Sequence, residues 1–324
     1  MTFNKPMTSK KRGLTRTALT ATALVAAMAV TAGTATAAGT PADSEKARAA
    51  AVSAHQPKAP KAPSGAGAKF RAAAPGAVET PTFSMTGVRK QTGLLDLFFA
   101  DGQGGFRAAY EVGVGYDWAA VSMDVDNDKD GYSDGSWSIS KEGMMSYTWT
   151  EDMIAQTKDI GGGWQIYNKV LSPGNLGGAA EADVMAVDKA GVMWVYLAYP
   201  DGRVAQRVQI GGGWQQYSEI AGQADLTGDG KADIVARDKS GTLWLYQGTG
   251  NYKAPFQART QIGGGWNTYD RLLSIGDLDG DGKSDLVARK ASGELFRYSG
   301  TGSASAPYAK PVKIGWGFQS YNLL

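Results

Sequence analysis

Apolar and polar residues alternate over short stretches through most of the chain, and glycines flank these stretches. Three clear examples are residues 191–197, 241–247 and 293–299, which read GVMWVYL, GTLWLYQ and GELFRYS. A period of two is typical of strands with one buried face, and a glycine turn beside such a run favours a hairpin. The 44 glycines, 9 tryptophans and 14 tyrosines also suit short strands joined by tight turns better than helices.

A short element recurs five times: an aliphatic residue, Gly, any residue, Gly and an aromatic residue. Its aromatic residues are Tyr116, Trp164, Trp214, Trp266 and Phe318, spaced by 48, 50, 52 and 52 residues. In the last four copies a tyrosine follows three positions later, whereas the first copy has Ala119 there. A period of about 50 residues holds about four short strands, the size of a propeller blade. The sequence therefore predicts an all-β, five-bladed β-propeller, with a solenoid of hairpins as the alternative.

The two ends of the repeat region complement each other. Residues 319–324 correspond to the piece that begins a new blade elsewhere, and the first repeat starts near Leu94 without that piece. We expect the C-terminal strand to pair with the N-terminal one, which closes the ring and leaves no long open edge. Residues 95–99 (LDLFF) are interpreted as a reduced copy of the ADIVARD block at 232–238, so the first blade is expected to lack a strand or a long loop.

The N-terminal 80 residues differ from the repeats. Residues 1–38 have a basic start, an alanine-rich apolar run and small residues at 35–38, the layout of a secretory signal peptide. Residues 39–80 are rich in Ala, Pro and Lys and are expected to be a disordered linker. The predicted domains are therefore a signal peptide (1–38), a linker (39–80) and a propeller (81–324), in a secreted, extracellular protein with no membrane span.

Composition removes several classes of function. There is no cysteine, so disulfides, thiolate zinc sites and cysteine nucleophiles are excluded, and the single histidine, His55, lies in the expected linker. Residues 1–80 hold 11 of the 33 basic and 3 of the 31 acidic side chains, which leaves residues 81–324 with a net charge of −6. An acidic domain gives no electrostatic support for nucleic-acid binding.

Acidic residues repeat at alternate positions in three loops. Residues 277–285 carry carboxylates at positions 1, 3, 5 and 9 and glycine at position 6, a pattern that suits oxygen ligands around calcium, with a backbone carbonyl at position 7. The candidate ligands are Asp126, Asp128, Asp130, Tyr132 and Asp134 in the first loop, Asp225, Thr227, Asp229, Lys231 and Asp233 in the second, and Asp277, Asp279, Asp281, Lys283 and Asp285 in the third.

We expect two or three structural Ca²⁺ sites in these loops. Plain polar turns are the alternative, because Asp and Gly favour turns in any case. The corresponding loop of another repeat has Asn175, Gly177, Ala179 and Asp183, and it is predicted not to bind a metal.

Two known families share these motifs. The I-G-x-G-W-x-x-Y element resembles the tachylectin family of five-bladed propeller lectins, and residues 276–288 (GDLDGDGKSDLVA) resemble the FG-GAP or VCBS repeats of integrin-type propellers and of many secreted bacterial proteins. Together the two resemblances cover about residues 86–324.

The tachylectin resemblance implies pockets between blades that accept N-acetylated hexosamines. On this resemblance the candidate carbohydrate-binding residues are Trp164, Trp214, Trp266, Gly163, Gly213 and Gly265. Packing of these tryptophans between the sheets is the alternative. The first and fifth copies depart from the pattern with Tyr116 and Phe318, and no regular Asp-Asn-Trp element precedes the glycines.

The leading functional hypothesis is a non-catalytic, monomeric lectin that binds a cell-surface or extracellular glycan. The alternative is a calcium-dependent protein-interaction module of the integrin-propeller type. A glycosidase would need a unique pair of carboxylates, whereas the acidic residues here repeat with the blades. We therefore expect no enzymatic activity.

Overall fold

The computed structural model describes residues 40–55, 80–152 and 154–324. The predicted signal peptide and residues 56–79 of the expected linker lie outside the described residues. None of the helices in the described ranges is both long and apolar enough to cross a membrane.

The described residues form five antiparallel sheets of four strands each, which we call the first to fifth blades. The first blade contains β20 (Tyr321–Leu323), β1 (Met85–Arg89), β2 (Leu95–Phe98) and β3 (Tyr110–Gly113). The second contains β4 (Ala119–Val125), β5 (Gly135–Ser140), β6 (Met145–Glu151) and β7 (Ile154–Gly161). The third contains β8 (Tyr167–Gly174), β9 (Asp183–Asp188), β10 (Met193–Tyr196) and β11 (Val208–Gly211).

The last two blades repeat the same order. The fourth contains β12 (Tyr217–Ala221), β13 (Ile234–Asp238), β14 (Leu243–Tyr246) and β15 (Thr260–Gly263). The fifth contains β16 (Arg271–Gly276), β17 (Asp285–Arg289), β18 (Leu295–Tyr298) and β19 (Val312–Gly315). Short 3-10 helices join successive blades: η1 (Trp164–Ile166), η2 (Trp214–Gln216), η3 (Trp266–Thr268) and η4 (Phe318–Ser320).

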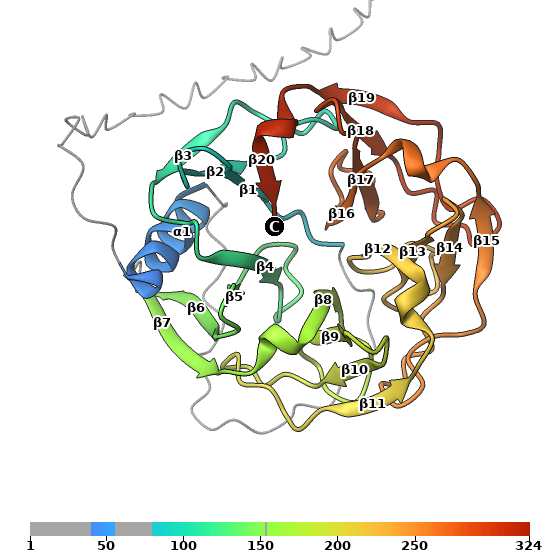
Figure 1. Cartoon of the computed structure of the whole chain (residues 1–324), viewed down its shortest axis with the longest axis horizontal. Coiled ribbons are helices and arrows are strands. Elements are labelled where there is room, and N and C mark those ends of the chain that lie inside the picture. The colour runs from blue at the N-terminus through green and yellow to red at the C-terminus, as the bar shows by residue number, and fades with distance from the viewer. Residues whose placement is uncertain (1–39, 56–79, 153) are drawn as a thin grey trace, which may run out of the picture. The chain divides into compact units, whose positions relative to one another are not determined.

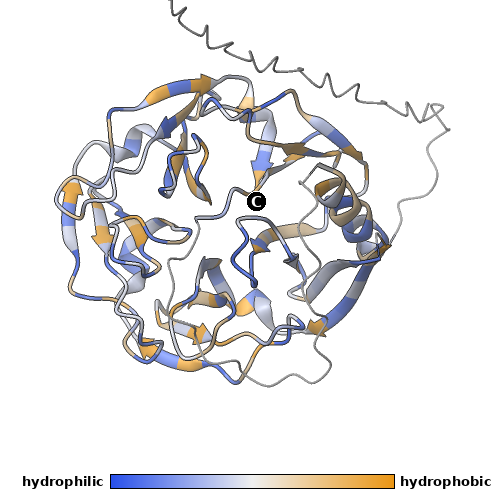
Figure 2. Ribbon diagram, turned by 180° about the vertical axis from the view of Figure 1, so that it is seen from behind, coloured by the Kyte–Doolittle hydropathy of each residue, from blue (hydrophilic) through white to orange (hydrophobic). Residues whose placement is uncertain are grey.

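The blades form a ring, which confirms the predicted five-bladed β-propeller. Figure 1 shows strands β4, β8, β12, β16 and β20 nearest the middle and the last strand of each blade at the outside. The core lies between blades: one cluster joins Met123 and Trp137 of the second blade to Val184 of the third. Apolar residues occur along the strands of every blade, as expected for sheets that pack face to face (Figure 2).

The ring closes through its two ends, as predicted. Strand β20 pairs antiparallel with β1, with Gly87 opposite Leu323 and Arg89 opposite Tyr321. The C-terminal strand thus supplies the innermost strand of the first blade, which therefore has four strands. Of the two alternatives expected for this blade, a missing strand or a missing long loop, the missing strand is wrong.

The interpretation of residues 95–99 as a copy of the ADIVARD block is also wrong. These residues begin in β2, the third strand of its blade, and Met85 pairs with Phe98 as Ile234 pairs with Tyr246. Residues 95–99 therefore correspond to the strand that follows the block, and β1 corresponds to the block itself. In the first blade no acidic loop precedes β1, so the sequence lacks the feature that identifies this block in other blades.

The expectation of a disordered linker is wrong for residues 41–55, which form helix α1 (Pro41–His55). Thr40 and Asp43 form a capping box, because Thr40 N donates to Asp43 Oδ2 at 3.2 Å and Asp43 N donates to Thr40 Oγ1 at 3.3 Å. Pro41 at the first helical position and the alanines that follow suit a helix. Ala51 and Val52 are buried in a cluster with Val88, Leu95, Leu97 and Tyr116 of the first blade and its exit turn.

Helix α1 occupies the junction between the first and second blades, where it contacts β3, β6 and β7 (Figure 1). At the next junction the Tyr167 and Tyr196 hydroxyls lie 2.5 Å apart. By strand register Thr148 takes the place of Tyr196, and Ala119 takes the place of Tyr167. The small residues leave room for the helix. The first copy of the repeat, which has Ala119 in place of the tyrosine, therefore lies where α1 binds.

Candidate functional site

The three acidic loops occupy the same place in their blades. Residues 126–134, 225–233 and 277–285 each connect the innermost strand to the second strand, in the second, fourth and fifth blades. In each loop the aspartate at position 9 lies at or just before the start of the second strand. The repeat thus places equivalent side chains on equivalent turns.

The structure brings together three acidic side chains in each loop. In every group the candidate ligand atoms lie within 4.8 Å of one another. The groups, which we call the acidic triads, are Asp126, Asp128 and Asp134; Asp225, Asp229 and Asp233; and Asp277, Asp279 and Asp285. Three carboxylates this close repel one another by on the order of 4 kcal/mol per pair at an effective dielectric of about 20, unless a cation or protons compensate.

Other predicted ligands are not part of the triads. Asp281 receives hydrogen bonds from Lys283 through Nζ at 2.8 Å and through the backbone N–H at 3.0 Å. Asp130 Oδ1 accepts from the backbone N–H of Tyr132 at 3.0 Å. Thr227, which holds position 3 of the second loop, is buried but carries no charge. A carbonyl ligand from Tyr132, Lys231 or Lys283 stays a prediction.

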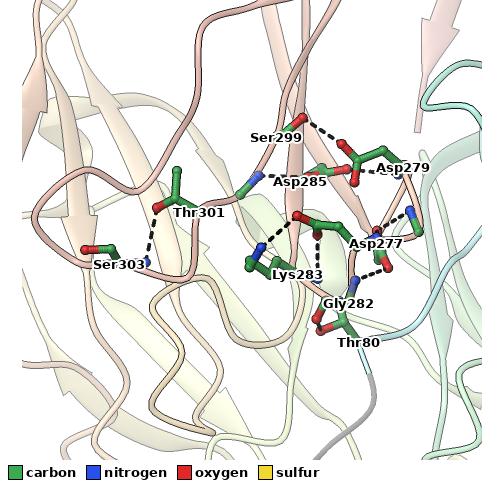
Figure 3. Close-up of polar contacts among 12 residues, drawn as sticks. Thr80, Asp277, Asp279, Gly282, Lys283, Asp285, Ser299, Thr301 and Ser303 are labelled. Atoms are coloured by element: carbon green, nitrogen blue, oxygen red, sulfur yellow. Dashed lines mark hydrogen bonds and ion pairs between the residues drawn. The ribbon is translucent and has the colours of Figure 1, made fainter.

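The first and last aspartates shape each loop by accepting backbone hydrogen bonds. Asp277 accepts from Gly280 N at 2.7 Å through Oδ1 and from Gly282 N at 2.7 Å through Oδ2. Asp285 accepts from Leu278 N at 3.0 Å and from Gly300 N at 2.8 Å (Figure 3). The backbone therefore holds these two carboxylates beside Asp279 before any ion binds.

Burial makes these carboxylates hard to ionise without a cation. Desolvation raises the pKa of Asp126 to about 7 and that of Asp134 to about 6. The same cause raises the pKa values of Asp233 and Asp285 to about 6. A bound divalent cation would offset this cost, because it favours the ionised form of every ligand.

One oxygen in the fifth-blade loop supports a fit to a cation. Asp279 Oδ2 accepts from Ser299 Oγ at 2.7 Å and lies 3.3 Å from Arg297 Nη2. Its other oxygen, Oδ1, is buried and has no hydrogen-bond partner within the described part of the chain. A buried carboxylate oxygen without a partner is costly. The all-oxygen donor set suits calcium, with which this atom could form a bond.

The loop at 175–183 has an amide where the acidic loops have their first carboxylate. The Asn175 side-chain amide donates to the carbonyls of Ala179 and Ala180 at 2.9 and 3.0 Å. Burial raises the pKa of Asp183 to about 8. The acidic groupings found in the described ranges do not include this loop.

The three candidate sugar-binding tryptophans are buried between blades. Trp164, Trp214 and Trp266 are 6–8% exposed. Each ring lies 4.6–4.8 Å from a tyrosine ring of the following blade: Tyr196, Tyr246 and Tyr298, respectively. The structure therefore gives these indoles the packing role that the sequence left open.

The glycines before these tryptophans remain accessible. Gly163, Gly213 and Gly265 are exposed, and each has a positive φ, between 85° and 100°. A Cβ atom at any of the three would meet nothing within 4 Å except, at Gly213, the end of the Gln216 side chain at 3.9 Å. The turns thus present open backbone to solvent, whereas the indole faces are covered.

Sequence analysis missed the most exposed aromatic residue of the described ranges. Trp316 is 81% exposed and occupies the middle position of the fifth glycine element, where three other copies have Gly162, Gly212 and Gly264. The other tryptophans, all of which the structure describes, are buried or half-buried. The sequence feature that could have identified Trp316 is the presence of a second aromatic residue in this copy of the glycine element.

Comparison with known proteins supports a repeat in this region. Residues 225–288 match the family model of the FG-GAP-like repeat. Curated proteins include no match to the chain. Similar solved structures include BBS1N in complex with ARL6DN, soaked with lead, at 11% identity and a TM-score of 0.37, covering 72% of this chain and 69% of that one.

A second similar structure is a protein of unknown function from Bacteroides caccae, at 9% identity and a TM-score of 0.36, covering 72% of this chain and 73% of that one. The family match begins at Asp225 and ends shortly after Asp285, so it includes two of the three acidic loops. Residues 225–288 of this β-propeller are therefore similar to the FG-GAP-like repeat.

Proposed function

We propose that this protein is a secreted, non-catalytic binding module in which calcium stabilises three blade loops. The glycine turns that join successive blades bind carbohydrate. Secretion rests on the signal-peptide layout of residues 1–38. A binding role is supported by the propeller fold with its FG-GAP-like repeat, which is typical of non-catalytic binding proteins.

The calcium proposal is carried by the acidic triads. Three equivalent loops each gather three carboxylates within 4.8 Å, although like charges repel. Asp279 adds a buried oxygen that lacks a partner in the described structure. Asp126, Asp128 and Asp134, or their counterparts, would hold the ion, which would supply the positive charge that fixes the loop.

The carbohydrate proposal rests on the glycine turns between blades rather than on the buried indoles. The exposed backbone at Gly163, Gly213 and Gly265 offers N–H groups that a sugar acetamido group could accept from. Trp316, 81% exposed, offers an aromatic face on which a sugar ring could stack. An N-acetylated hexosamine remains the proposed ligand because of the tachylectin-like element.

A glycan array probed with the purified protein, with calcium and then with EDTA, tests the proposal. We expect selective binding to N-acetylated sugars, competition by free N-acetylglucosamine, and weaker binding in a folded W316A variant. Binding to no glycan by a folded, calcium-loaded protein would contradict the carbohydrate proposal and favour the protein-interaction alternative. Calcium binding would still be judged separately, by titration.

A further inference from the structure

The middle of the ring contains a cavity that the proposed function does not use. Its volume is about 290 Å³, and it is lined by residues of the innermost strands β4, β8, β12 and β16, by residues just before and within β1, and by Arg48 of α1. Figure 1 shows these four strands around the centre of the ring. The cavity is thus built by all five blades and helix α1 together.

Polar atoms without partners gather on this cavity. Five of its lining residues have a buried side-chain atom with no hydrogen-bond partner in the described structure: Arg48 Nε, Ser84 Oγ, Ser122 Oγ, Ser172 Oγ and Arg271 Nε. Arg48 is 1% exposed, Ser172 6% and Ser84 8%. Buried polar groups are normally paired, so these atoms need a hydrogen-bonding partner inside the cavity, either water or a ligand.

The charge of the lining favours an anion. Three cationic side chains line the cavity, Arg48, Lys169 and Arg271, against two carboxylates, Asp124 and Glu219. Asp124 is bound on both oxygens by Arg48 Nη2 at 2.9 Å, and Glu219 Oε2 lies 3.4 Å from Arg271 Nη1. Both carboxylates are therefore engaged, and one positive charge is in excess among the lining residues; Glu45, which interacts with Arg48, does not line the cavity.

The unpartnered atoms are mainly donors. The two arginine Nε–H groups can only donate, and the three serine hydroxyls can donate to a strong acceptor. The ion pair with Asp124 and a 3.1 Å hydrogen bond to Thr86 Oγ1 fix the Arg48 guanidinium, so its Nε–H is held in place. A ligand with several acceptor oxygens and negative charge complements this arrangement.

From this geometry we infer that the central cavity binds a small oxyanion, of the carboxylate, phosphate or sulfate type, between Arg48, Ser84, Ser172 and Arg271. The cavity is near the lower end of the usual range for small-molecule pockets, so the ligand is a small anion rather than an oligosaccharide. This inference is independent of the proposed carbohydrate site, which is at the glycine turns between blades.

Selenate is a suitable probe, because its selenium scatters anomalously and its calcium salt is soluble. Crystals of the full chain soaked in selenate should show an anomalous peak in the cavity. Calorimetric titration of selenate should show one site. Ordered water only, at a saturating selenate concentration, would overturn the inference.

A matched set of serine variants tests the location. We expect the S84A/S172A double variant to bind selenate at least about tenfold more weakly, because it loses two hydrogen bonds to a charged ligand. Ser138 is the control: its Oγ is also buried without a partner in the described ranges, but Ser138 does not line the cavity. Unchanged affinity in the double variant, or equal weakening in S138A, would contradict the inference.

Discussion

Arg48 of the N-terminal helix and Asp124 of the second blade form a buried ion pair across 76 residues of sequence. Arg48 Nη2 lies 2.9 Å from both carboxylate oxygens, and the two side chains are 1% and 5% exposed. The pair fixes α1 to the innermost strand of the second blade, although the sequence between them includes β1, β2 and β3 of the first blade.

Removal of one partner should destabilise the protein strongly. We expect R48M to lower the free energy of unfolding by about 3–5 kcal/mol, because Asp124 is then a buried charge without its partner. The R48M/D124L double variant should be less destabilised than the sum of the two single variants. Urea unfolding of the four proteins measures this coupling, and strictly additive effects would show that the pair does not hold the helix.

The acidic neighbour of Arg48 should make the stability pH-dependent. Burial raises the pKa of Glu45 from 4.5 to about 7, while Arg48 opposes the shift. Between these values the native state binds more protons than the unfolded state, so the free energy of unfolding falls as pH rises from about 5 to 7. We expect E45Q to reduce this fall, measured by urea unfolding at saturating calcium.

Asp43 provides the control for this prediction. It is exposed in the same helix, and hydrogen bonds from Thr40 lower its pKa, so its stabilising effect is lost only as pH falls through a lower range. The D43N variant should therefore keep the pH dependence of the wild type between pH 5 and 8. If E45Q and D43N have the same dependence, Glu45 is not the titrating group.

Two tryptophans of the repeat should respond oppositely to substitution. Trp214 is buried against Tyr246 and Tyr217, and W214A should lower the free energy of unfolding by about 3–5 kcal/mol. Trp316 is exposed, and W316A should change stability by no more than about 0.5 kcal/mol while weakening glycan binding. Thermal melts and glycan titrations of both variants measure the contrast; a large loss of stability in W316A would contradict it.

The repeat made the architecture predictable from the sequence. The recurrence of the glycine-aromatic element at about 50 residues sets the number of blades, and a first repeat without its initial strand required the C-terminal strand to complete it. Both inferences depend only on local spacing and on the need to pair strand edges. Both are confirmed.

Helix α1 and its position against the ring could not be predicted from the sequence. Its capping box at Thr40 and Asp43 was present in the sequence, but an alanine-rich helix lacks a clear apolar face. Its docking site arises from small residues, Ala119 and Thr148, in another part of the chain. Only the assembled ring shows that these residues leave space between two blades.

The candidate sites were partly predictable. Spacing located the triads, because alternate loop residues converge, but it could not show that the carboxylate at position 5 joins the triad in one loop, as Asp229, and not in another, as Asp281. Nor could it show whether the indole of Trp214 faces a ligand or the next blade, since both need an aromatic residue after a glycine turn. That choice depends on tertiary packing.

Calcium binding by the triads is the central claim. Protein stripped with EDTA should bind three calcium ions per chain in a calorimetric titration and should gain thermal stability as it does so. Binding should weaken as pH falls from 7 to 5, since protons compete for Asp126, Asp233 and Asp285.

Variants in single loops make the titration decisive. D285N should remove one calcium site, because it neutralises a carboxylate of the fifth-blade triad, whereas N175A should remove none. The measurement to make first is therefore calcium titration of the wild type, D285N and N175A. The account predicts three, two and three ions per chain; absence of calcium binding to the folded wild type, or the same number of ions in D285N as in the wild type, would contradict it.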